Sequence, residues 1–406
     1  IPLKHRPRST FTQRPLRLLI LLDSPQHEAL GQDIMHKLKE QHAATVFFGV
    51  GGVMSCHAGT NKLAESPLNL NTNGLADFSP AKFFRRYFYS KTLQKHCREK
   101  EIEAVLTIGE VSHFLHGVKH LHKRLNMPCF HCGTCELFQK NSVKETTIEL
   151  INAYREIFCF YPLQAENLKE LGVQASSLGH PSFDSCSEYI ATETAKPLGP
   201  PFKIAVLPCK KGRYVQRFMS LVTEAVVNLR KSGKQVEVVL LLPGGSNPRH
   251  FENFSGMQAQ YIRGKDVNEA LGSCDVALDM QGENVLRLSI LGVPGISLQG
   301  FGPWLKFPLT NWPSKNGNGQ PKHSFLNPVN SILESQIVPE VDVRDLRKEK
   351  TLLAESINIL LENPAMRQKQ LTCFAQLREK LSPPEAAPFA RTVADSMLGK
   401  LARSPD

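Results

Sequence analysis

The stretch from Cys274 to Leu298 constrains the fold of this chain more than any other segment. An apolar run ends at Gly282, a short helical segment follows, and Gly292-Val293-Pro294 turns the chain into a second apolar run. This order predicts a parallel unit of strand, glycine turn, helix and strand. Glycine lets the backbone approach a ligand, and the following helix directs free N–H groups towards an anion. We therefore expect a ligand-binding turn at Gly282, at the carboxyl end of a strand.

Strands and helices alternate on both sides of this unit. Apolar strands are predicted at 16–22, 46–50 and 104–108, and a second series begins at residue 203 after a segment rich in proline. Such alternation indicates parallel sheets, so we predict an α/β protein with two Rossmann-like domains. The predicted division is a basic tail at 1–15, an N-terminal domain at 16–191, a linker at 192–202, a C-terminal domain at 203–362 and helices at 363–406.

The charge of the chain favours anionic partners. Of the 406 residues, 49 are Lys or Arg and 38 are Asp or Glu, which gives a formal net charge of +11. This balance suits nucleic acid, anionic lipid or phosphorylated sugars without choosing among them. No apolar run approaches the roughly 18 residues of a membrane span, and the scattered cysteines are typical of a reduced, intracellular protein. The chain begins at Ile1 rather than at methionine, so we expect an upstream segment.

A second turn has the features of a phosphate site. Residues 207–213, Leu-Pro-Cys-Lys-Lys-Gly-Arg, follow a predicted strand and open a predicted helix. Backbone donors at such a turn, together with Lys210, Lys211 and Arg213, would receive a phosphate. An ordinary charged turn between a strand and a helix is the alternative, and it is the commoner outcome for this spacing.

Cysteines with metal-site spacing follow the third predicted strand. Cys129, Cys132 and Cys135 have the spacing of a zinc or iron–sulfur site, with His131 between them. However, Cys129 and Cys132 fall at the end of an apolar strand, where alternate side chains face opposite sides, and no fourth cysteine follows at ferredoxin spacing. We therefore favour buried cysteines without a metal.

The histidines just upstream offer a general base. His113, His116 and His120 are spaced to lie near one face of a helix predicted over 113–125. A histidine at a junction between strand and helix suits proton transfer, because its ordinary pKa is about 6.5. Solvated histidines are the commoner outcome and stay as the alternative.

Aromatic and basic residues are mixed over 83–89, Phe-Phe-Arg-Arg-Tyr-Phe-Tyr. In one interpretation the rings enter a membrane interface and the arginines bind lipid phosphate. In the other the rings belong to the core and the arginines to a solvated face. The sequence leaves these two interpretations equal.

Several short motifs follow one another along residues 16–380. They are Phe48-Gly49-Val50-Gly51-Gly52, Phe160-Tyr161-Pro162-Leu163, Gly179-His180-Pro181 with Asp184, Leu207-Pro208 with Lys211 and Gly212, Gly282 with Leu286, Asn330, and Ile337-Val338-Pro339-Glu340. In order and spacing these motifs resemble the lipid-A-disaccharide synthase family of GT-B glycosyltransferases.

The resemblance implies a GT-B fold, in which two Rossmann-like β/α/β domains face a central cleft. It implies transfer of an acylated glucosamine-type sugar from a UDP-sugar donor to a lipid-linked sugar acceptor in lipid A biosynthesis. No cofactor and no metal are expected, because basic side chains and helix N-termini would balance the pyrophosphate charge. The expected place is the cytoplasm, at the inner face of an anionic membrane surface. A homodimer is compatible with the resemblance, and no nucleic acid is expected.

The same resemblance assigns roles to single residues. Glu110 and His113 stand where the family has a pair of aspartates, so His113 would be the catalytic general base and Glu110 a supporting carboxylate. The donor-binding residues would be Lys211, Gly212, Gly282, Glu283 and Asn330.

Departures from the family pattern fall on residues that carry chemistry. The family's opening S-G-E-x-S-G-D is Leu-Asp-Ser-Pro-Gln-His-Glu at 22–28, and Arg287 stands where the nucleotide-sugar domain of the family has a glutamate. A guanidinium only donates hydrogen bonds, so it cannot replace a carboxylate that accepts them from ribose or sugar. The alternative function is therefore a catalytically degenerate binding or scaffold protein on the same fold.

Overall fold

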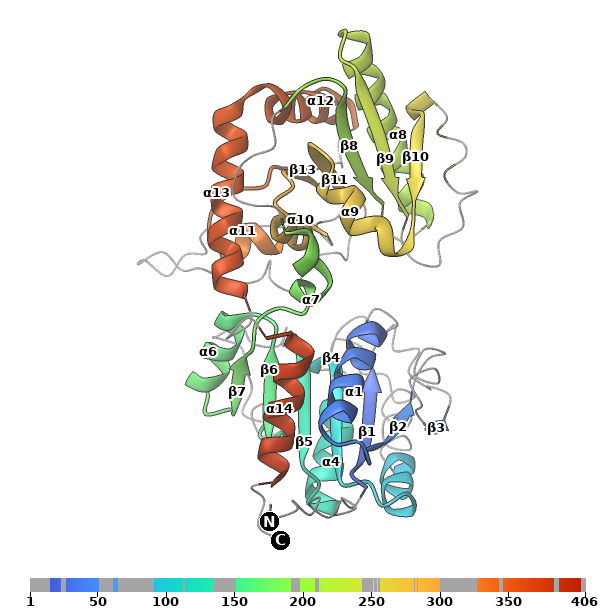
Figure 1. Ribbon diagram of the computed structural model, residues 1–406, viewed down its shortest axis with the longest axis vertical. Helices are drawn as coiled ribbons and strands as arrows, with labels where there is room; N and C mark the ends of the chain where they lie inside the picture. Colours follow the sequence, from blue (N-terminus) through green and yellow to red (C-terminus); the bar gives the residue numbers. More distant parts are fainter. Residues whose placement is uncertain are drawn as a thin grey trace, which may run out of the picture. The chain divides into compact units, whose positions relative to one another are not determined.

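The computed structural model contains two α/β units, one of which is assembled from both ends of the chain (Figure 1). Unit 1 comprises Ile1–Pro181 and Pro383–Asp406, and unit 2 comprises Ser182–Ser382. The structure describes residues 15–22, 27–50, 61–64, 91–111, 114–134, 151–190, 198–208, 212–242, 251, 254, 256–280, 282, 284–299, 327–342, 346–382 and 387–402.

Unit 1 is built on a parallel sheet that is wound outwards in both directions from its first strand. The strands are β1 (Arg17–Leu22), β2 (Val46–Val50), β3 (Asn61–Ala64), β4 (Ala104–Glu110), β5 (Cys129–Thr134), β6 (Glu156–Cys159) and β7 (Ala175–Ser177), in the order β3-β2-β1-β4-β5-β6-β7. Leu18 of β1 pairs with Phe47 on one side and with Ala104 on the other. The strand order therefore reverses between β1 and β4, which is where open α/β sheets bind ligands.

The central strands of unit 1 form because they are apolar and covered on both faces. All residues of β4 are buried, and so are residues 18–22 of β1. A parallel strand between two layers of helices has a continuous apolar sequence rather than an alternating one. By contrast, β4 and β5 end on the polar residues Glu110 and Thr134, at the carboxyl edge of the sheet.

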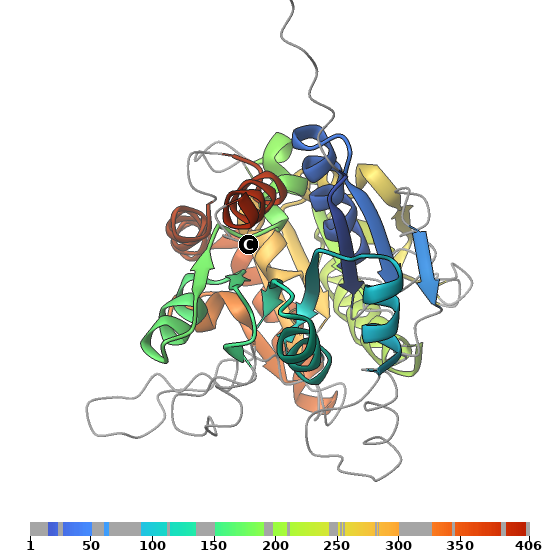
Figure 2. The same ribbon diagram turned by 90° about the horizontal axis from the view of Figure 1, so that it is seen from below.

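Helices cover both faces of this sheet. In the described part of unit 1 they are α1 (Glu28–Gln41), a helical segment at 91–99, α4 (Leu115–Leu125), α6 (Pro162–Glu170) and α14 (Phe389–Ala402). Helix α1 buries Ile34, Met35 and Leu38 along one face, the spacing expected of an amphipathic helix. Figure 2 shows α1 and α14 on one side of the sheet and α4 on the other.

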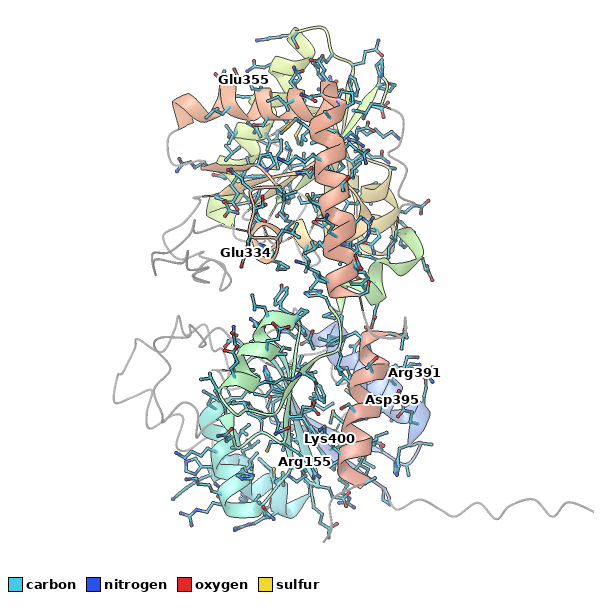
Figure 3. All side chains as sticks on the ribbon, turned by 90° about the vertical axis from the view of Figure 1, so that its left-hand side faces the viewer. Arg155, Glu334, Glu355, Arg391, Asp395 and Lys400 are labelled. Carbon is cyan, nitrogen blue, oxygen red and sulfur yellow. The ribbon has the colours of Figure 1, made fainter. Side chains whose placement is uncertain are left out.

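Helix α14 completes the core of unit 1, although it comes from the opposite end of the chain. It packs beside α1 and buries Phe389, Val393 and Met397. The ring of Phe389 lies 5.8 Å from that of Phe160, edge to face. Lys400 Nζ lies 3.0 Å from Oε2 of the buried Glu156 at the start of β6. Figure 3 labels Lys400 on α14 and Arg155, the residue before Glu156 in the sequence.

Unit 2 repeats the doubly wound plan. Its strands are β8 (Phe202–Leu207), β9 (Val236–Leu241), β10 (Ala259–Ile262), β11 (Val276–Met280), β12 (Gly295–Gln299) and β13 (Glu340–Asp342), in the order β10-β9-β8-β11-β12-β13. Its helices are α7 (Ser182–Cys186), α8 (Gly212–Lys231), α9 (Val267–Gly272), α10 (Val285–Leu291), α11 (Pro328–Ile332), α12 (Leu346–Glu362) and α13 (Pro364–Leu381), with 3-10 turns η3 (Ser187–Tyr189) and η5 (Gly264–Asp266). The strand order reverses between β8 and β11.

Packing in unit 2 fixes both the central strands and the last long helix. Phe218 of α8, Leu360 of α12 and Leu278 of β11 are all buried in one apolar cluster. The side-chain amide of Gln370 on α13 binds the backbone of Gly295 twice, because Nε2 donates to its carbonyl oxygen at 3.1 Å and Oε1 accepts its N–H at 3.0 Å. Helix α13 is thereby attached to the start of β12.

The structure divides the chain differently from the sequence-based prediction. Unit 2 begins at Ser182, before the linker predicted at 192–202. The helices predicted together at 363–406 are shared between the units, with α13 in unit 2 and α14 in unit 1. Sequence periodicity shows that a helix has an apolar face, but it does not show which sheet receives that face.

Candidate functional site

The two turns predicted to bind the donor leave the same edge of the unit 2 sheet. Strands β8 and β11 are parallel neighbours, and Leu207 at the end of β8 pairs with Asp279 near the end of β11. The turn after β8 and the turn at Gly282 therefore begin on adjacent strands, where the strand order reverses. This is the position at which doubly wound sheets bind their ligands.

The turn after β8 opens a long helix. Helix α8 begins at Gly212 and extends over 20 residues. Its N-terminus provides N–H groups without helical partners and a partial positive charge, and both favour an anion. Lys210 and Lys211 lie outside the described residues, so the contact between Lys211 and a phosphate stays a prediction.

Gly282 occupies a position that disfavours a side chain. Its φ is +77°, in the left-handed region that favours glycine. A Cβ at this position would lie 3.1 Å from Cβ of Asn327, 3.1 Å from Nε2 of Gln299 and 3.3 Å from Oγ of Ser297. All three neighbours are buried. The turn therefore packs directly on buried polar side chains, while Glu283 beside it lies outside the described residues.

Asp279 connects the end of β11 to the start of α10. It is fully buried, and its Oδ2 and Oδ1 accept the backbone N–H and the side-chain Nδ2 of Asn284 at 3.1 and 2.8 Å. A carboxylate here satisfies a helix-terminal N–H and interacts favourably with the helix dipole. Asp279 was not among the residues predicted from the sequence, although a charged residue inside an apolar strand was a usable signal.

Asn330 uses its entire side-chain amide within unit 2. Nδ2 donates to the carbonyl oxygen of Val338 at 2.8 Å and to Oε1 of Glu340 at 3.1 Å. Oδ1 accepts the N–H groups of Ile337 and Val338 at 2.9 and 2.8 Å. These bonds fill the two donor and two acceptor positions of an amide. The geometry therefore favours support of the adjacent loop by Asn330 over the direct donor contact predicted from the sequence.

The same network includes a neighbour of Gly282. Asn327 caps α11 by accepting the N–H of Asn330 at 3.0 Å, and its own Nδ2 donates to Oε1 of Glu340 at 2.6 Å. Glu340 thus connects both asparagines to the start of β13. The surface behind Gly282 is consequently held by hydrogen bonds rather than by apolar packing alone.

Arg287 is engaged by two neighbouring helices. Its Nε donates to Oδ1 of Asn268 on α9 at 2.6 Å, and Nδ2 of Asn268 donates to the carbonyl oxygen of Ser185 on α7. The thiol of Cys186 lies 3.9 Å from the same Oδ1. The departure from the family pattern therefore has a structural reason, because the guanidinium connects α10 to α9 and, through Asn268, to α7.

Replacing Arg287 with methionine should lower the free energy of unfolding by about 1.5–3 kcal/mol, the usual range for a hydrogen bond to a charged group. Methionine keeps much of the stem and leaves the buried Asn268 oxygen without this donor. Urea unfolding measures the change. Lys231→Met removes an exposed charge in the same unit and should stay within about 0.5 kcal/mol. Equal effects of the two substitutions would contradict the assigned role.

The carboxyl edge of unit 1 carries Glu110, the predicted supporting carboxylate. Glu110 ends β4, is 7% exposed, and pairs in register with Thr134 at the end of β5. Oγ1 of Thr134 donates a hydrogen bond of 2.8 Å to Oε2 of Glu110. His113 lies outside the described residues, and α4 begins at Leu115, so the role of His113 as a base stays a prediction. Thr134 was missed as a partner of Glu110, since strand register is not visible in a single sequence.

The cysteines of β5 are buried core residues. Cys129 and Cys132 are fully buried and, by strand alternation, face opposite sides of the sheet. Burial raises the pKa of both thiols, which disfavours the thiolate form that binds metals. His131 is also fully buried, with Nδ1 2.8 Å from Oγ1 of Thr107. Within the described part of the chain no group of three metal-ligating side chains occurs, and Cys135 lies outside that part.

The Gly179-His180-Pro181 motif ends the first segment of unit 1. The imidazole of His180 is buried, with its centroid 5.4 Å from those of both Phe160 and Tyr161. Burial lowers the pKa of His180 to about 3, so the ring is neutral near pH 7. A neutral ring among aromatic side chains anchors the chain immediately before it enters unit 2.

Comparison with known proteins identifies the family of this chain. The family model described as lipid-A-disaccharide synthetase matches residues 19–385. The chain belongs to the lipid-A-disaccharide synthetase family. The lipid-A-disaccharide synthase of Gloeothece citriformis is 23% identical over 381 residues, which cover 90% of this chain and 96% of the relative. The probable mitochondrial lipid-A-disaccharide synthase of Arabidopsis thaliana is 22% identical, over 94% of this chain and 90% of the relative.

Membership of the lipid-A-disaccharide synthetase family confirms the resemblance predicted from the motifs. It also confirms the predicted class, a glycosyltransferase of lipid A biosynthesis. Solved structures agree on the fold. MurG from Acinetobacter baumannii matches with a TM-score of 0.58 and 12% identity, over 95% of this chain and 100% of that one. A UDP-GlcNAc 2-epimerase from Neisseria meningitidis, bound to UDP-GlcNAc, matches with a TM-score of 0.58 and 11% identity, over 95% and 100%. The predicted α/β fold with two Rossmann-like units is confirmed.

Proposed function

We propose that this chain transfers an acylated glucosamine-type sugar from a UDP-sugar donor to a lipid-linked sugar phosphate. The family model, which spans both units, supports the reaction class. The observation that carries the donor assignment is the glycine-only turn at Gly282, on the strand next to the one that leads into Gly212 of α8. Backbone N–H groups at such turns are suited to a diphosphate.

In this proposal unit 2 binds the UDP portion of the donor. The N-terminus of α8 at Gly212 and the side chain of Lys211 balance the diphosphate charge. Gly282 allows the backbone to approach the ligand, and Glu283 accepts hydrogen bonds from hydroxyl groups of the donor. Asn330 acts indirectly, because its amide supports the neighbouring loop. The proposal includes no cofactor.

Unit 1 supplies the proton transfer in this proposal. His113 takes the proton from the acceptor hydroxyl while the hydroxyl oxygen forms a bond to the sugar carbon. The bond between that carbon and the UDP oxygen breaks, and UDP leaves with the electron pair. Glu110 provides negative charge that stabilises the protonated imidazole. The position of Glu110 at the carboxyl end of β4 supports this role.

We also propose contact with an anionic membrane surface, on its cytoplasmic side, because the donor and the acceptor carry acyl chains. None of the helices in the described ranges is both long and apolar enough to cross a bilayer. The net charge of +11 suits electrostatic contact with anionic lipid. The segment 83–89, which the sequence offered for this contact, lies outside the described residues. Self-association into a homodimer also stays a prediction, which sedimentation equilibrium tests.

Titration with UDP tests the donor site, and Gly282→Ala is the informative variant. The left-handed conformation costs alanine about 1–2 kcal/mol, so relief of this strain should disturb the turn and weaken UDP binding about tenfold. Isothermal titration calorimetry measures the affinity. Gly272→Ala is the matched control, because a Cβ on Gly272 meets nothing within 4 Å. Equal UDP affinity in the two variants would remove Gly282 from the site. A wild-type chain that binds neither UDP nor UDP-sugar would favour the alternative function, a catalytically degenerate binding or scaffold protein.

A further inference from the structure

We infer that Thr134 is a positioning residue that orients the Glu110 carboxylate for sugar transfer, an inference that rests on the proposed function. The two residues end adjacent parallel strands and stand directly opposite each other in the register. Oγ1 of Thr134 donates to Oε2 of Glu110 over 2.8 Å. This bond joins the two strands at the carboxyl edge of the sheet, on the ligand-binding side of unit 1.

Two glycines, Gly109 and Gly133, immediately precede Glu110 and Thr134 in their strands. Gly109 and Gly133 are also paired in register, with φ values of +132° and +157°. A Cβ on Gly133 would lie 1.9 Å from the carbonyl oxygen of Gly109. Glycine inside a strand weakens the strand, and it often marks a close approach of two backbones. The paired glycines let the strands approach closely immediately before Glu110 and Thr134, the last residues of β4 and β5.

The chemistry of the pair gives the hydroxyl a definite function. An ionised carboxylate only accepts hydrogen bonds, and a hydroxyl that donates to it makes a strong, charge-assisted bond. Threonine is branched at Cβ and has few χ1 rotamers, so its hydroxyl has a well-defined direction. Fixing one oxygen of Glu110 limits rotation of the carboxylate plane. The carboxylate is then held in one orientation before substrates bind, which is the condition for efficient stabilisation of developing charge.

The same sheet contains a matched pair in which an equivalent bond is only structural. Oγ of Ser176 donates to Oε1 of Glu156 at 2.7 Å, and Glu156 is 7% exposed, like Glu110. Glu156 begins β6, at the amino edge of the sheet, and its other oxygen lies 3.0 Å from Nζ of Lys400. Loss of either hydroxyl should therefore have a similar effect on stability, whereas only the loss at Thr134 should affect the reaction.

Steady-state kinetics of four variants of the whole chain test the inference. The assay measures release of UDP with a UDP-linked diacylated glucosamine as donor and a diacylated glucosamine phosphate as acceptor. Thr134→Val, which removes the hydroxyl at nearly constant volume, should lower kcat about 10–100-fold with KM changed less than about threefold. Thr134→Ser keeps the donor and should restore kcat to within about threefold of wild type. Glu110→Gln should lose at least as much as Thr134→Val, and Ser176→Ala should keep wild-type kcat.

Thermal unfolding of each variant separates misplacement from misfolding. If Thr134→Val does not fold, Thr134→Ala replaces it in the same comparison. A wild-type kcat in the valine or alanine variant, while Glu110→Gln is impaired, would overturn the positioning role and leave the proposed function intact. Wild-type turnover by Glu110→Gln would overturn the role as well. Absence of transfer by the wild-type chain would instead reject the proposed function, and the inference with it.

Discussion

Removing residues 383–406 should leave unit 1 unable to fold, although the deletion removes no strand from the described sheet. Helix α14 contributes the buried side chains Phe389, Val393 and Met397, and large-to-small changes at such positions typically cost about 2–5 kcal/mol each. The sum is comparable to the whole stability of a typical domain, roughly 5–15 kcal/mol. Glu156 would also lose Lys400, the cation on its carboxylate. The deletion therefore exposes an apolar face of the sheet and leaves a buried charge unpaired.

Near-ultraviolet circular dichroism and limited proteolysis measure this outcome. The truncated chain should retain a protease-resistant fragment from unit 2, residues 182–382, while residues 1–181 are degraded. A chain shortened only by residues 403–406, after the end of α14, is the control and should behave as wild type. Resistance of residues 1–181 in the longer deletion would show that α14 is dispensable for the core.

Replacing His113 with alanine should lower sugar transfer by about 10²–10⁴-fold, the usual contribution of a general base. Without the imidazole, no group of suitable pKa takes the proton from the acceptor hydroxyl in the proposed mechanism. Binding of UDP should be unchanged, because the proposed UDP ligands all belong to unit 2. Turnover and calorimetry on the same preparation measure the two quantities separately.

The matched control for this substitution is His122→Ala. His122 is an exposed histidine of α4, at the opposite end of the helix from residue 113. Its loss should leave both turnover and UDP affinity as in the wild type. Turnover retained by His113→Ala would remove the residue from its proposed role, and lost UDP binding would indicate a wider disturbance of the fold.

The sequence was sufficient to predict the features that depend on neighbours along the chain. Continuous apolar runs marked the buried strands, and Gly282 was identified from the change between strand and helix patterns. Because each β/α/β unit is local in sequence, its parallel pairing followed from the order of its elements. In the structure the turns near Gly212 and Gly282 leave adjacent strands.

Features that depend on distant contacts could not be predicted in the same way. Helices were predicted at 363–406, but the packing of α14 on unit 1 depends on a sheet built from residues far away along the chain. Arg287 was interpreted as a defect in the donor site, whereas it binds Asn268. Asn330 was assigned to the donor from the family resemblance, and its amide makes hydrogen bonds to backbone groups and to Glu340. In each case the deciding partner was set by tertiary structure.

The return of α14 to unit 1 reverses the order in which the units can mature during synthesis. A ribosome produces residues 1–181 first, but that unit lacks its final helix until residue 402 has left the exit tunnel. Residues 182–382 form a continuous segment and are able to fold while translation proceeds. The portion of the polypeptide made earliest is thus finished last, and its apolar interior stays incomplete until α14 is available.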